Sequence, residues 1–306
     1  RILAPADFGV MAIALVVVGF VEIFAQVGIG PALIQRLNLE DRHIRAAFSF
    51  SLVVGIVFFA AMYFSAPAIG AFFEDALLID VLRWIAGEQL GSVEDGLGEN
   101  AAQIEHIYST IGRKMAHLHA HSSQWVPPAG FVRQAWDHAG LVGETPLWGR
   151  FWELEVLTTA QRSLIKAARK SLAADLSLID CGPSNYGMIH ADFVPENLLV
   201  NDHDIRVIDF DDAGLGWYLF DIATALFFIQ DDANYLLAKS ALITAYLAER
   251  PLAEAGLTAL PLFMLARSFT YLGWVHTRPG TQTAEELTPV LVDICCGLAE
   301  AYLAIR

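Results

Sequence analysis

One stretch of this chain, YGMIHADFVPENLLVNDHDIRVIDFDDAG at residues 186–214, is compatible with few folds. Two apolar runs, Asn197 to Val200 and Ile205 to Ile208, flank the polar tetrapeptide NDHD, which is typical of a tight turn. The pattern predicts a short β-hairpin that supports polar side chains at its two ends. These side chains are His190, Asp192 and Asn197 at one end and Asp209 at the other.

The spacing of these residues matches the catalytic and metal-binding template of kinases, H-x-D-x-x-x-x-N followed by D-F. Transfer of a γ-phosphoryl group needs a carboxylate on a rigid loop to receive the acceptor's proton, and Asp192 occupies that place. It also needs Mg²⁺, for which the Asn197 amide and the Asp209 carboxylate are suitable oxygen ligands. We expect His190 to brace the loop. Asp211 would support the metal-binding turn, unless it belongs to an acidic surface loop.

Four further segments extend the pattern: RWIAGEQLG, IGRKMAHLHAHS, LVGETPLWGRFWELE and FMLARSFTYLGWVHTR. With the motif above, they make residues 84–306 resemble the C-terminal lobe of small-molecule kinases of the aminoglycoside phosphotransferase and choline kinase type. The resemblance implies a mainly α (α+β) fold, the use of ATP and Mg²⁺, and a small hydroxylated metabolite or antibiotic as acceptor. It places the adenine-binding hinge at Trp84, Ile85 and Ala86. It also implies that Asp221 tethers the catalytic loop, although the position of Asp221 fits a helix N-cap as well.

The chain departs from the family's frequent His-Gly-Asp-Leu-His-x-Gly-Asn at positions that bear no ligand. The departures are Ala191, Phe193, Val194 and Glu196. We expect them to leave the chemistry intact and to reshape the acceptor pocket.

Apolar periodicity predicts helices over most of this region. Their ranges are 99–121, 157–177, 220–248, 259–276 and 284–304. On the fourth helix, Arg267, Tyr271 and Trp274 recur at near-helical spacing. They are candidates for lining the acceptor pocket, although such an aromatic stripe more often packs in a core.

Two other patterns are interpreted as structural. The alternating His117, His119 and His121 look like metal ligands, but residues i and i+2 of a helix face apart, so we expect a frayed helix end. The tryptophans of PLWGRFWELE, Trp148 and Trp152, are expected to pack.

Residues 1–83 differ from the rest of the chain in containing two long apolar runs. Residues 8–29 are apolar apart from Glu22 and Gln26, and residues 46–73 carry no charge. Both runs reach the roughly 20 residues that a membrane-spanning helix needs. They predict a transmembrane two-helix hairpin in contact with the lipid bilayer, and the alternative is a pair of buried helices in a soluble core. Glu22 and Gln26 share one helical face, which in a membrane would contact a partner helix.

The segment RILAPADFGVMAIALVVVGFVEIFAQVGIGPALIQR, with the second apolar run and SAPAIGAFFED, resembles the early part of polysaccharide flippases of the multidrug and oligosaccharidyl-lipid exporter superfamily. The resemblance implies the second and third transmembrane helices of a transporter of lipid-linked oligosaccharides. Two helices cannot enclose a transport cavity, so we expect no transport by this chain alone. Arg36, Arg42 and Arg45 would place the connecting loop in the cytoplasm and both ends outside, where a kinase lobe finds no ATP.

The family's N-terminal lobe supplies a glycine-rich loop and a Lys that hold the nucleotide phosphates. The first Lys of this chain is Lys114, well after the hinge, and the apolar hairpin stands where that lobe belongs. We therefore expect the kinase N-lobe to be absent and turnover by this chain to be small, because positioning and electrostatics supply most of the catalysis. The chain starts with Arg1, which fits a fragment, a fusion or a processed product.

The charge distribution excludes one class of partner. Of the net charge of −15, residues 1–86 carry −2 (five Arg, no Lys and seven acids), which leaves −13 on the rest and argues against nucleic-acid binding. The three cysteines have neither metal-ligand nor disulfide-framework spacing and fit a reducing compartment. Three hypotheses remain: an ATP-dependent phosphotransferase, cytoplasmic if functional; a partial flippase with a passenger kinase lobe; and a non-catalytic nucleotide-binding module.

Overall fold

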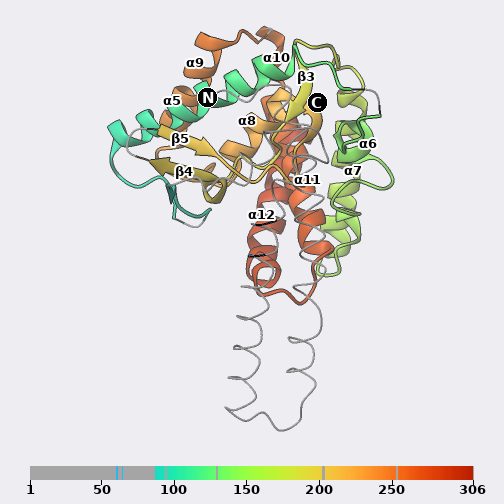
Figure 1. The fold of residues 1–306 in the computed structure, drawn as a ribbon. Coiled ribbons are helices and arrows are strands. Elements are labelled where there is room, and N and C mark those ends of the chain that lie inside the picture. Colours follow the sequence, from blue (N-terminus) through green and yellow to red (C-terminus); the bar gives the residue numbers. More distant parts are fainter. Residues whose placement is uncertain are drawn as a thin grey trace. The chain divides into compact units, whose positions relative to one another are not determined.

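The computed structural model of the chain divides into two compact units, chiefly Leu3–Ile85 and Ala86–Arg306. It describes residues 87–93, 95–128, 130–201, 204–252 and 254–305, and two isolated positions in the first unit. Apart from those two positions, Ala60 and Phe64, the helices predicted at 8–29 and 46–73 and the hinge predicted at 84–86 lie outside the described residues. The labelled elements of Figure 1 belong to the second unit.

Helices dominate the second unit, as the sequence predicted. In chain order they are α5 (Ala101–Ser122), α6 (His138–Val142), α7 (Thr159–Leu176), α8 (Tyr218–Phe227), α9 (Tyr235–Glu249), α10 (Glu254–Thr258), α11 (Leu260–His276) and α12 (Gln282–Ala304), with 3₁₀ turns η1 (Phe151–Glu153) and η2 (Pro195–Asn197). Local capping explains two of the starts. Asn100 caps α5 by accepting the Gln103 N–H, and Thr158 and Gln161 form a capping box at α7.

Two small sheets accompany the helices. The first has the order β1 (Glu88–Gln89), β4 (Leu198–Asn201), β5 (Asp204–Val207), and the second has the order β2 (Ala135–Trp136), β6 (Gly214–Trp217), β3 (Tyr186–Ile189). The predicted hairpin is confirmed as the antiparallel pair β4–β5, which runs from Leu198 opposite Val207 to Asn201 opposite Asp204. The second sheet was not predicted, because strands of two to four residues are too short to show a period of two.

The single helix predicted at 220–248 is wrong, because the chain breaks between α8 and α9. In the break, the Asp232 carboxylate accepts the backbone N–H groups of Leu97 and Asn234 at 3.0 and 2.7 Å. A short acidic side chain that bonds to nearby backbone competes with helical hydrogen bonding. The apolar pattern continues on both sides of the break, which is why periodicity alone did not reveal it.

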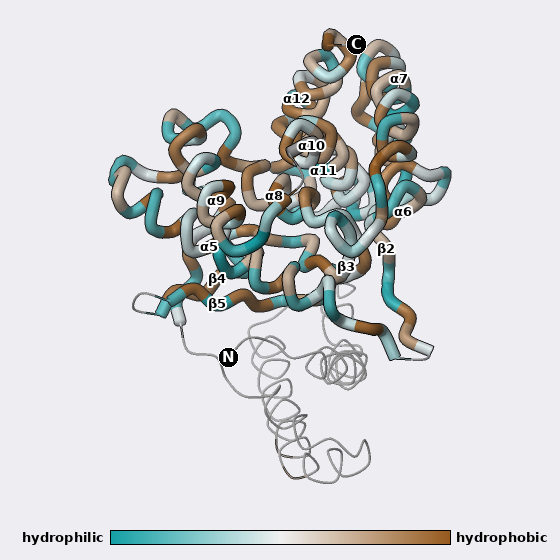
Figure 2. Tube along the Cα trace, turned by 90° about the horizontal axis from the view of Figure 1, so that it is seen from above, coloured by the Kyte–Doolittle hydropathy of each residue, from teal (hydrophilic) through white to brown (hydrophobic). Residues whose placement is uncertain are grey.

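Helix α11 forms the centre of the core and is buried along nearly its whole length. It packs against α8 and α12, while α5 lies along α9. In Figures 1 and 2 the pair α5–α9 lies on one side of α8 and α11, and α6 and α7 lie on the other. A helix that is apolar all round is a core helix, so the loops that meet α11 have a rigid support.

Helix α12 is, within the described part of the chain, the one helix long and apolar enough to span a membrane by length and composition. It packs against α7 and α11, with Leu291, Cys295 and Ala299 buried. A core helix of a soluble lobe has the same features.

Candidate active site

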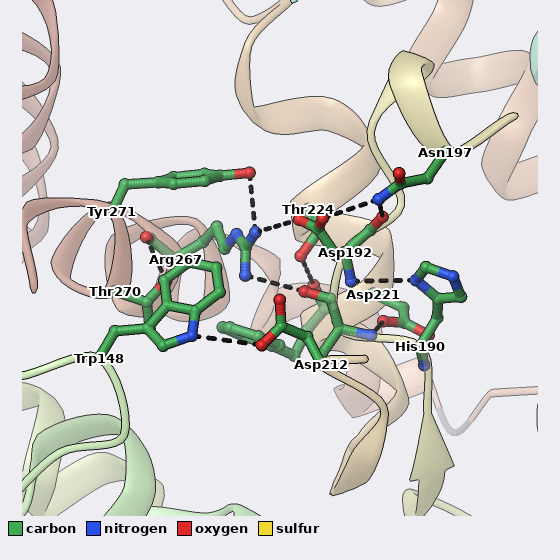
Figure 3. Close-up of polar contacts among 12 residues, drawn as sticks. Trp148, His190, Asp192, Asn197, Asp212, Asp221, Thr224, Arg267, Thr270 and Tyr271 are labelled. Carbon is green, nitrogen blue, oxygen red and sulfur yellow. Dashed lines mark hydrogen bonds and ion pairs between the residues drawn. The ribbon is translucent and has the colours of Figure 1, made fainter. Parts of the chain in front are cut away.

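Asp192 follows β3, and both oxygens of its carboxylate accept a hydrogen bond (Figure 3). Asn197 Nδ2 donates to Asp192 Oδ2 at 2.7 Å and to the Asp192 carbonyl at 3.0 Å. Arg267 Nη2 donates to Asp192 Oδ1 at 3.0 Å. The Asp192 side chain is 24% exposed, whereas that of Arg267 is fully buried. The predicted base is therefore a fixed carboxylate that remains accessible from outside.

The loop that carries the base is held by Asp221, a fully buried carboxylate in the first turn of α8. Its Oδ1 accepts Ala191 N–H at 2.6 Å, and its Oδ2 accepts His190 N–H and the His119 Nε2 contact, each at 2.9 Å. Ala191 has a φ of 65°, a left-handed conformation that costs a non-glycine residue roughly 1–2 kcal/mol. The N-cap interpretation of Asp221 is wrong, because Trp217 occupies that position.

His190 joins this loop to the end of β5. Its Nδ1 accepts the Asp192 N–H at 3.2 Å, so its Nε2 carries the proton and donates to the Ile208 carbonyl at 2.9 Å. Ile208 N–H in turn donates to the Asn197 carbonyl at 3.0 Å. These bonds bring Asn197 and Asp209, the residue after Ile208, to the same edge of the hairpin.

Asp209 begins an acidic turn after β5. It is exposed, has a φ of 59°, and accepts the Asp211 N–H on Oδ1 at 3.3 Å. Arg133 secures the turn by donating to the carbonyls of Phe210 and Asp211, both at 2.7 Å, and of Ala213 at 2.6 Å. The turn is thus held through its backbone, and the exposed Asp209 carboxylate remains available for a ligand.

Asp212 is the residue of this turn that lies beside Arg267 in Figure 3. Its Oδ1 accepts a bond from Trp148 Nε1 at 3.3 Å, and its carbonyl accepts one from Trp136 Nε1 at 2.8 Å. Burial raises the pKa of the Asp212 carboxyl, the charge of Asp192 raises it further, and Arg267 opposes the shift. No ion pair to Asp212 is found among the described residues.

The oxygen atoms at this edge fit a hard divalent cation. Asn197 uses its amide nitrogen toward Asp192, which leaves its Oδ1 for a ligand, and Asp209 presents an exposed carboxylate. In the described part of the chain, no group of three His, Cys, Asp or Glu could hold a metal unaided.

An open pocket of ≈ 680 Å³ lies between β1, β4 and α5, apart from Asp192. Its lining residues are Gly87, Glu88, Gln89, Leu90, Gln103, His106, Ile107, Val200, Asn201 and Ile205. A Cβ at Gly87 would lie 2.9 Å from Leu199 Cβ, so glycine lets the chain approach β4 closely. The predicted hinge residues Trp84, Ile85 and Ala86, which immediately precede this strand, lie outside the described residues.

The three residues of the predicted stripe on α11 differ in their surroundings. Arg267 is turned toward the base and donates to Tyr271 Oη at 2.8 Å. Tyr271 is buried, and burial raises the pKa of its hydroxyl, so the group stays protonated. Trp274 is half-buried and lies under the Arg278 guanidinium at 4.5 Å.

The alternating histidines lie on a regular part of α5, so the expected frayed end is wrong. As expected, they face apart: His117 Nε2 lies 3.1 Å from Glu249, while His119 is buried against Asp221. Burial lowers the pKa of His119, and the bond to Asp221 partly opposes this.

Sequence reasoning missed three contacts of the site. Arg133 and Trp148, which hold the acidic turn, come from a segment without periodicity, and Trp148 was expected only to pack. Arg267 was assigned to the acceptor pocket but contacts the base. The available signal was chemical: a turn rich in carboxylates needs N–H donors from elsewhere in the chain.

Comparisons with known proteins find similarity to small-molecule kinases. A homoserine kinase of Acidiphilium cryptum is 30% identical over 176 residues, 55% of this chain and 52% of that protein. A microcompartment-associated aminopropanol kinase structure is 35% identical with a TM-score of 0.60, covering 65% of this chain and 63% of that one. An amicoumacin kinase in complex with AMP-PNP, Ca²⁺ and Ami is 20% identical with a TM-score of 0.51, covering 68% and 63%, and shows the shared fold.

The chain spans about half the length of this homoserine kinase. Residues 1–91 match the model of a polysaccharide biosynthesis protein family, and residues 66–253 match that of the phosphotransferase enzyme family. Both resemblances drawn from the sequence are therefore confirmed. Because the second match covers more than half of the 306 residues, the chain belongs to the phosphotransferase enzyme family.

Proposed function

We propose that this chain is a small-molecule kinase lobe that binds ATP with Mg²⁺ and transfers the γ-phosphoryl group to a hydroxyl. The observation that carries the proposal is the Asp192 carboxylate, fixed through both oxygens and still partly exposed, beside the ligand oxygens of Asn197 and Asp209. A base on a rigid loop beside oxygen ligands is what phosphoryl transfer requires. His190, Asp211 and Asp221 have supporting roles in this proposal.

The proposed step is an in-line displacement. The acceptor oxygen forms a bond to the γ-phosphorus while the bond from that phosphorus to the bridging oxygen breaks, which leaves ADP. The hydroxyl proton passes to the carboxylate of Asp192. Mg²⁺, held by Asn197 and Asp209, would supply neutralisation of phosphate charge.

We also propose that the acceptor carries an amine. The similar proteins include kinases named for homoserine and aminopropanol. In this chain, Asp212 is a half-buried carboxylate without an ion-pair partner among the described residues, and the one cation beside it, Arg267, is committed to Asp192. A carboxylate next to an indole ring suits an ammonium group.

Thermal unfolding with ATP, in the presence and absence of Mg²⁺, tests nucleotide binding. We expect Mg²⁺-dependent stabilisation by ATP that Asp209→Ala removes. Asp204→Ala is the matched control, because Asp204 lies on the same hairpin and pairs with Lys114 at 2.6 Å on the exposed surface. Equal ATP stabilisation of Asp209→Ala and the wild type would show that the metal-ligand assignment is wrong.

ADP release over a panel of alcohols tests transfer. Amino alcohols should react faster than the same alcohols without the amine, and Asp212→Asn should remove that difference. Asp192→Asn should lower turnover by about 100-fold or more. Stabilisation by ATP without transfer to any acceptor would favour the non-catalytic nucleotide-binding module, and no stabilisation at all would favour the passenger lobe of a partial flippase.

For the domain organisation, we propose a membrane hairpin in residues 1–83 and the kinase lobe in residues 84–306. The match of residues 1–91 to a polysaccharide biosynthesis protein family supports the first part. The lobe would be cytoplasmic, because it needs ATP, and the hairpin would then have the orientation opposite to the one that Arg36, Arg42 and Arg45 favour. Alkaline carbonate extraction of the whole chain from cell membranes should leave it in the pellet, and its release into the supernatant would contradict membrane insertion.

A further inference from the structure

Arg267 is a buried cation in the middle of α11 that contacts the catalytic loop twice. Its Nη1 donates to the Ala191 carbonyl at 2.9 Å, and its Nη2 donates to Asp192 Oδ1 at 3.0 Å. Nη2 also donates to Tyr271 Oη at 2.8 Å. Both terminal nitrogens are thus used within the protein, and the side chain is fully buried.

The Arg267 guanidinium is buried among aromatic rings, with Asp192 as its ion-pair partner. Its guanidinium carbon lies 4.1, 4.8 and 5.3 Å from the ring centres of Tyr271, Trp148 and Phe220, and its Nε is buried without a hydrogen-bond partner. A buried ion pair adds little stability over apolar residues of similar volume, because both charges lose their hydration. Stability alone therefore does not account for this arginine.

The loop that Arg267 contacts needs to be held from both sides. Ala191 is in the left-handed region, with its N–H bonded to Asp221 in α8 and its carbonyl bonded to Arg267 in α11. The next residue, Asp192, gives Oδ2 to Asn197 and Oδ1 to Arg267. Among the residues that the structure describes, Arg267 is the one whose side chain bonds to both the strained backbone and the carboxylate of the base.

We propose that Arg267 is a positioning residue that sets the orientation of the Asp192 carboxylate and secures Ala191 in its left-handed conformation. This inference rests on the proposed function for the identity of the base. It gives Arg267 a role different from the predicted lining of the acceptor pocket, because both of its terminal nitrogens donate to the catalytic loop. An error of about 1 Å in the place of a reacting group can cost about 100-fold in rate, so the contact bears on catalysis.

The test compares Arg267→Met and Arg267→Lys with a matched control, Arg250→Met. Arg250 is also buried at 7% exposure, stacks on Tyr218 at 4.2 Å and donates to the carbonyls of Pro183 and Ser184. Its hydrogen bonds run to Tyr246, Pro183 and Ser184 and do not involve Ala191 or Asp192. The control therefore loses an arginine of similar burial without disturbing the base directly.

With the whole chain, Arg267→Met should lower kcat by about 100-fold, with the KM for MgATP unchanged. Arg267→Lys should recover part of kcat, because an ammonium group keeps the charge and loses the fork geometry. Arg250→Met should lower the Tm and keep kcat at temperatures where it is folded. The proposal is overturned if Arg267→Met raises the acceptor KM at constant kcat, or if both Met variants lower kcat equally.

A second measurement tests the proposal if the wild type shows no turnover. The absence of turnover would count against the proposed function and not against the contact of Arg267 with the catalytic loop. Hydrogen exchange in a peptide that covers residues 189–198 should accelerate in Arg267→Met and not in Arg250→Met. Exchange in α7 serves as the reference for global opening. Equal exchange of residues 189–198 in the two Met variants would refute the positioning role.

Discussion

Replacement of Asp221 by Asn tests whether one buried carboxylate holds the catalytic loop. Its two oxygens accept three bonds, from Ala191 N–H, His190 N–H and His119 Nε2. Asparagine has the same shape but one acceptor oxygen. In its better orientation the amide oxygen takes the place of Oδ2 and still accepts from His190 N–H and His119 Nε2. The amide NH₂ group then faces the Ala191 N–H, which loses its acceptor.

The magnitude follows from these contacts. A buried donor left without an acceptor costs roughly 1–3 kcal/mol, and each of the two remaining bonds loses about 1 kcal/mol when its acceptor becomes neutral. The free energy of unfolding should therefore fall by about 3–5 kcal/mol. For a unit of this size each kcal/mol lowers the Tm by about 2–4 °C, so we expect a fall on the order of 10 °C.

Thermal unfolding followed by circular dichroism measures this fall, with Asp180→Asn as the control. Asp180 is exposed, and its side chain accepts the Gly182 N–H at 2.9 Å, so its loss should cost far less. If Asp221→Asn unfolds at the same temperature as Asp180→Asn, the reasoning from buried donors is refuted.

The remaining predictions concern pH and packing. Burial lowers the pKa of His119 below 6.5 in the folded state. The neutral His119 side chain therefore contributes its full stabilisation above pH 6.5, and this stabilisation is lost as the pH falls toward the folded-state pKa. In His119→Gln the urea midpoint should fall less steeply over this pH range. Gly112→Ala should destabilise by about 1–3 kcal/mol, because its Cβ would lie 2.3 Å from the Leu242 carbonyl oxygen between α5 and α9. Gly297→Ala in α12, where a Cβ has nothing within 4 Å, should stabilise by about 0.5–1 kcal/mol in the same urea titration. Trp148→Phe should raise the KM of an amino-alcohol acceptor, since Asp212 loses its Nε1 donor.

Part of the fold was predictable because it is local. The β4–β5 hairpin follows from two apolar runs around a turn, and the long helices follow from apolar periodicity that the core preserves. The break between α8 and α9 was not predictable from periodicity. It depends on Asp232 bonding to Leu97, a residue distant in sequence, so that no window centred on the break contains both partners.

The candidate site likewise has residues that the sequence predicted and residues that it did not. The residues assigned to the base and the metal, Asp192, Asn197 and Asp209, lie within one strand–turn–hairpin unit, so their spacing already implies that they meet. The cations were harder to assign. Arg133 and Arg267 are single residues without a motif, and a helical pattern says which residues share a face but not which loop that face meets.

The sequence by itself determined the chemistry that this chain can offer, because hairpin strands that are adjacent in the chain carry their polar ends to one edge. Only the tertiary structure decided what holds that chemistry in place. Asp192 is paired with Arg267, 75 positions away, and Ala191 with Asp221, 30 positions away. Those partners come from α11 and α8, and the packing of two buried helices against a loop is settled by side-chain fit across the whole core.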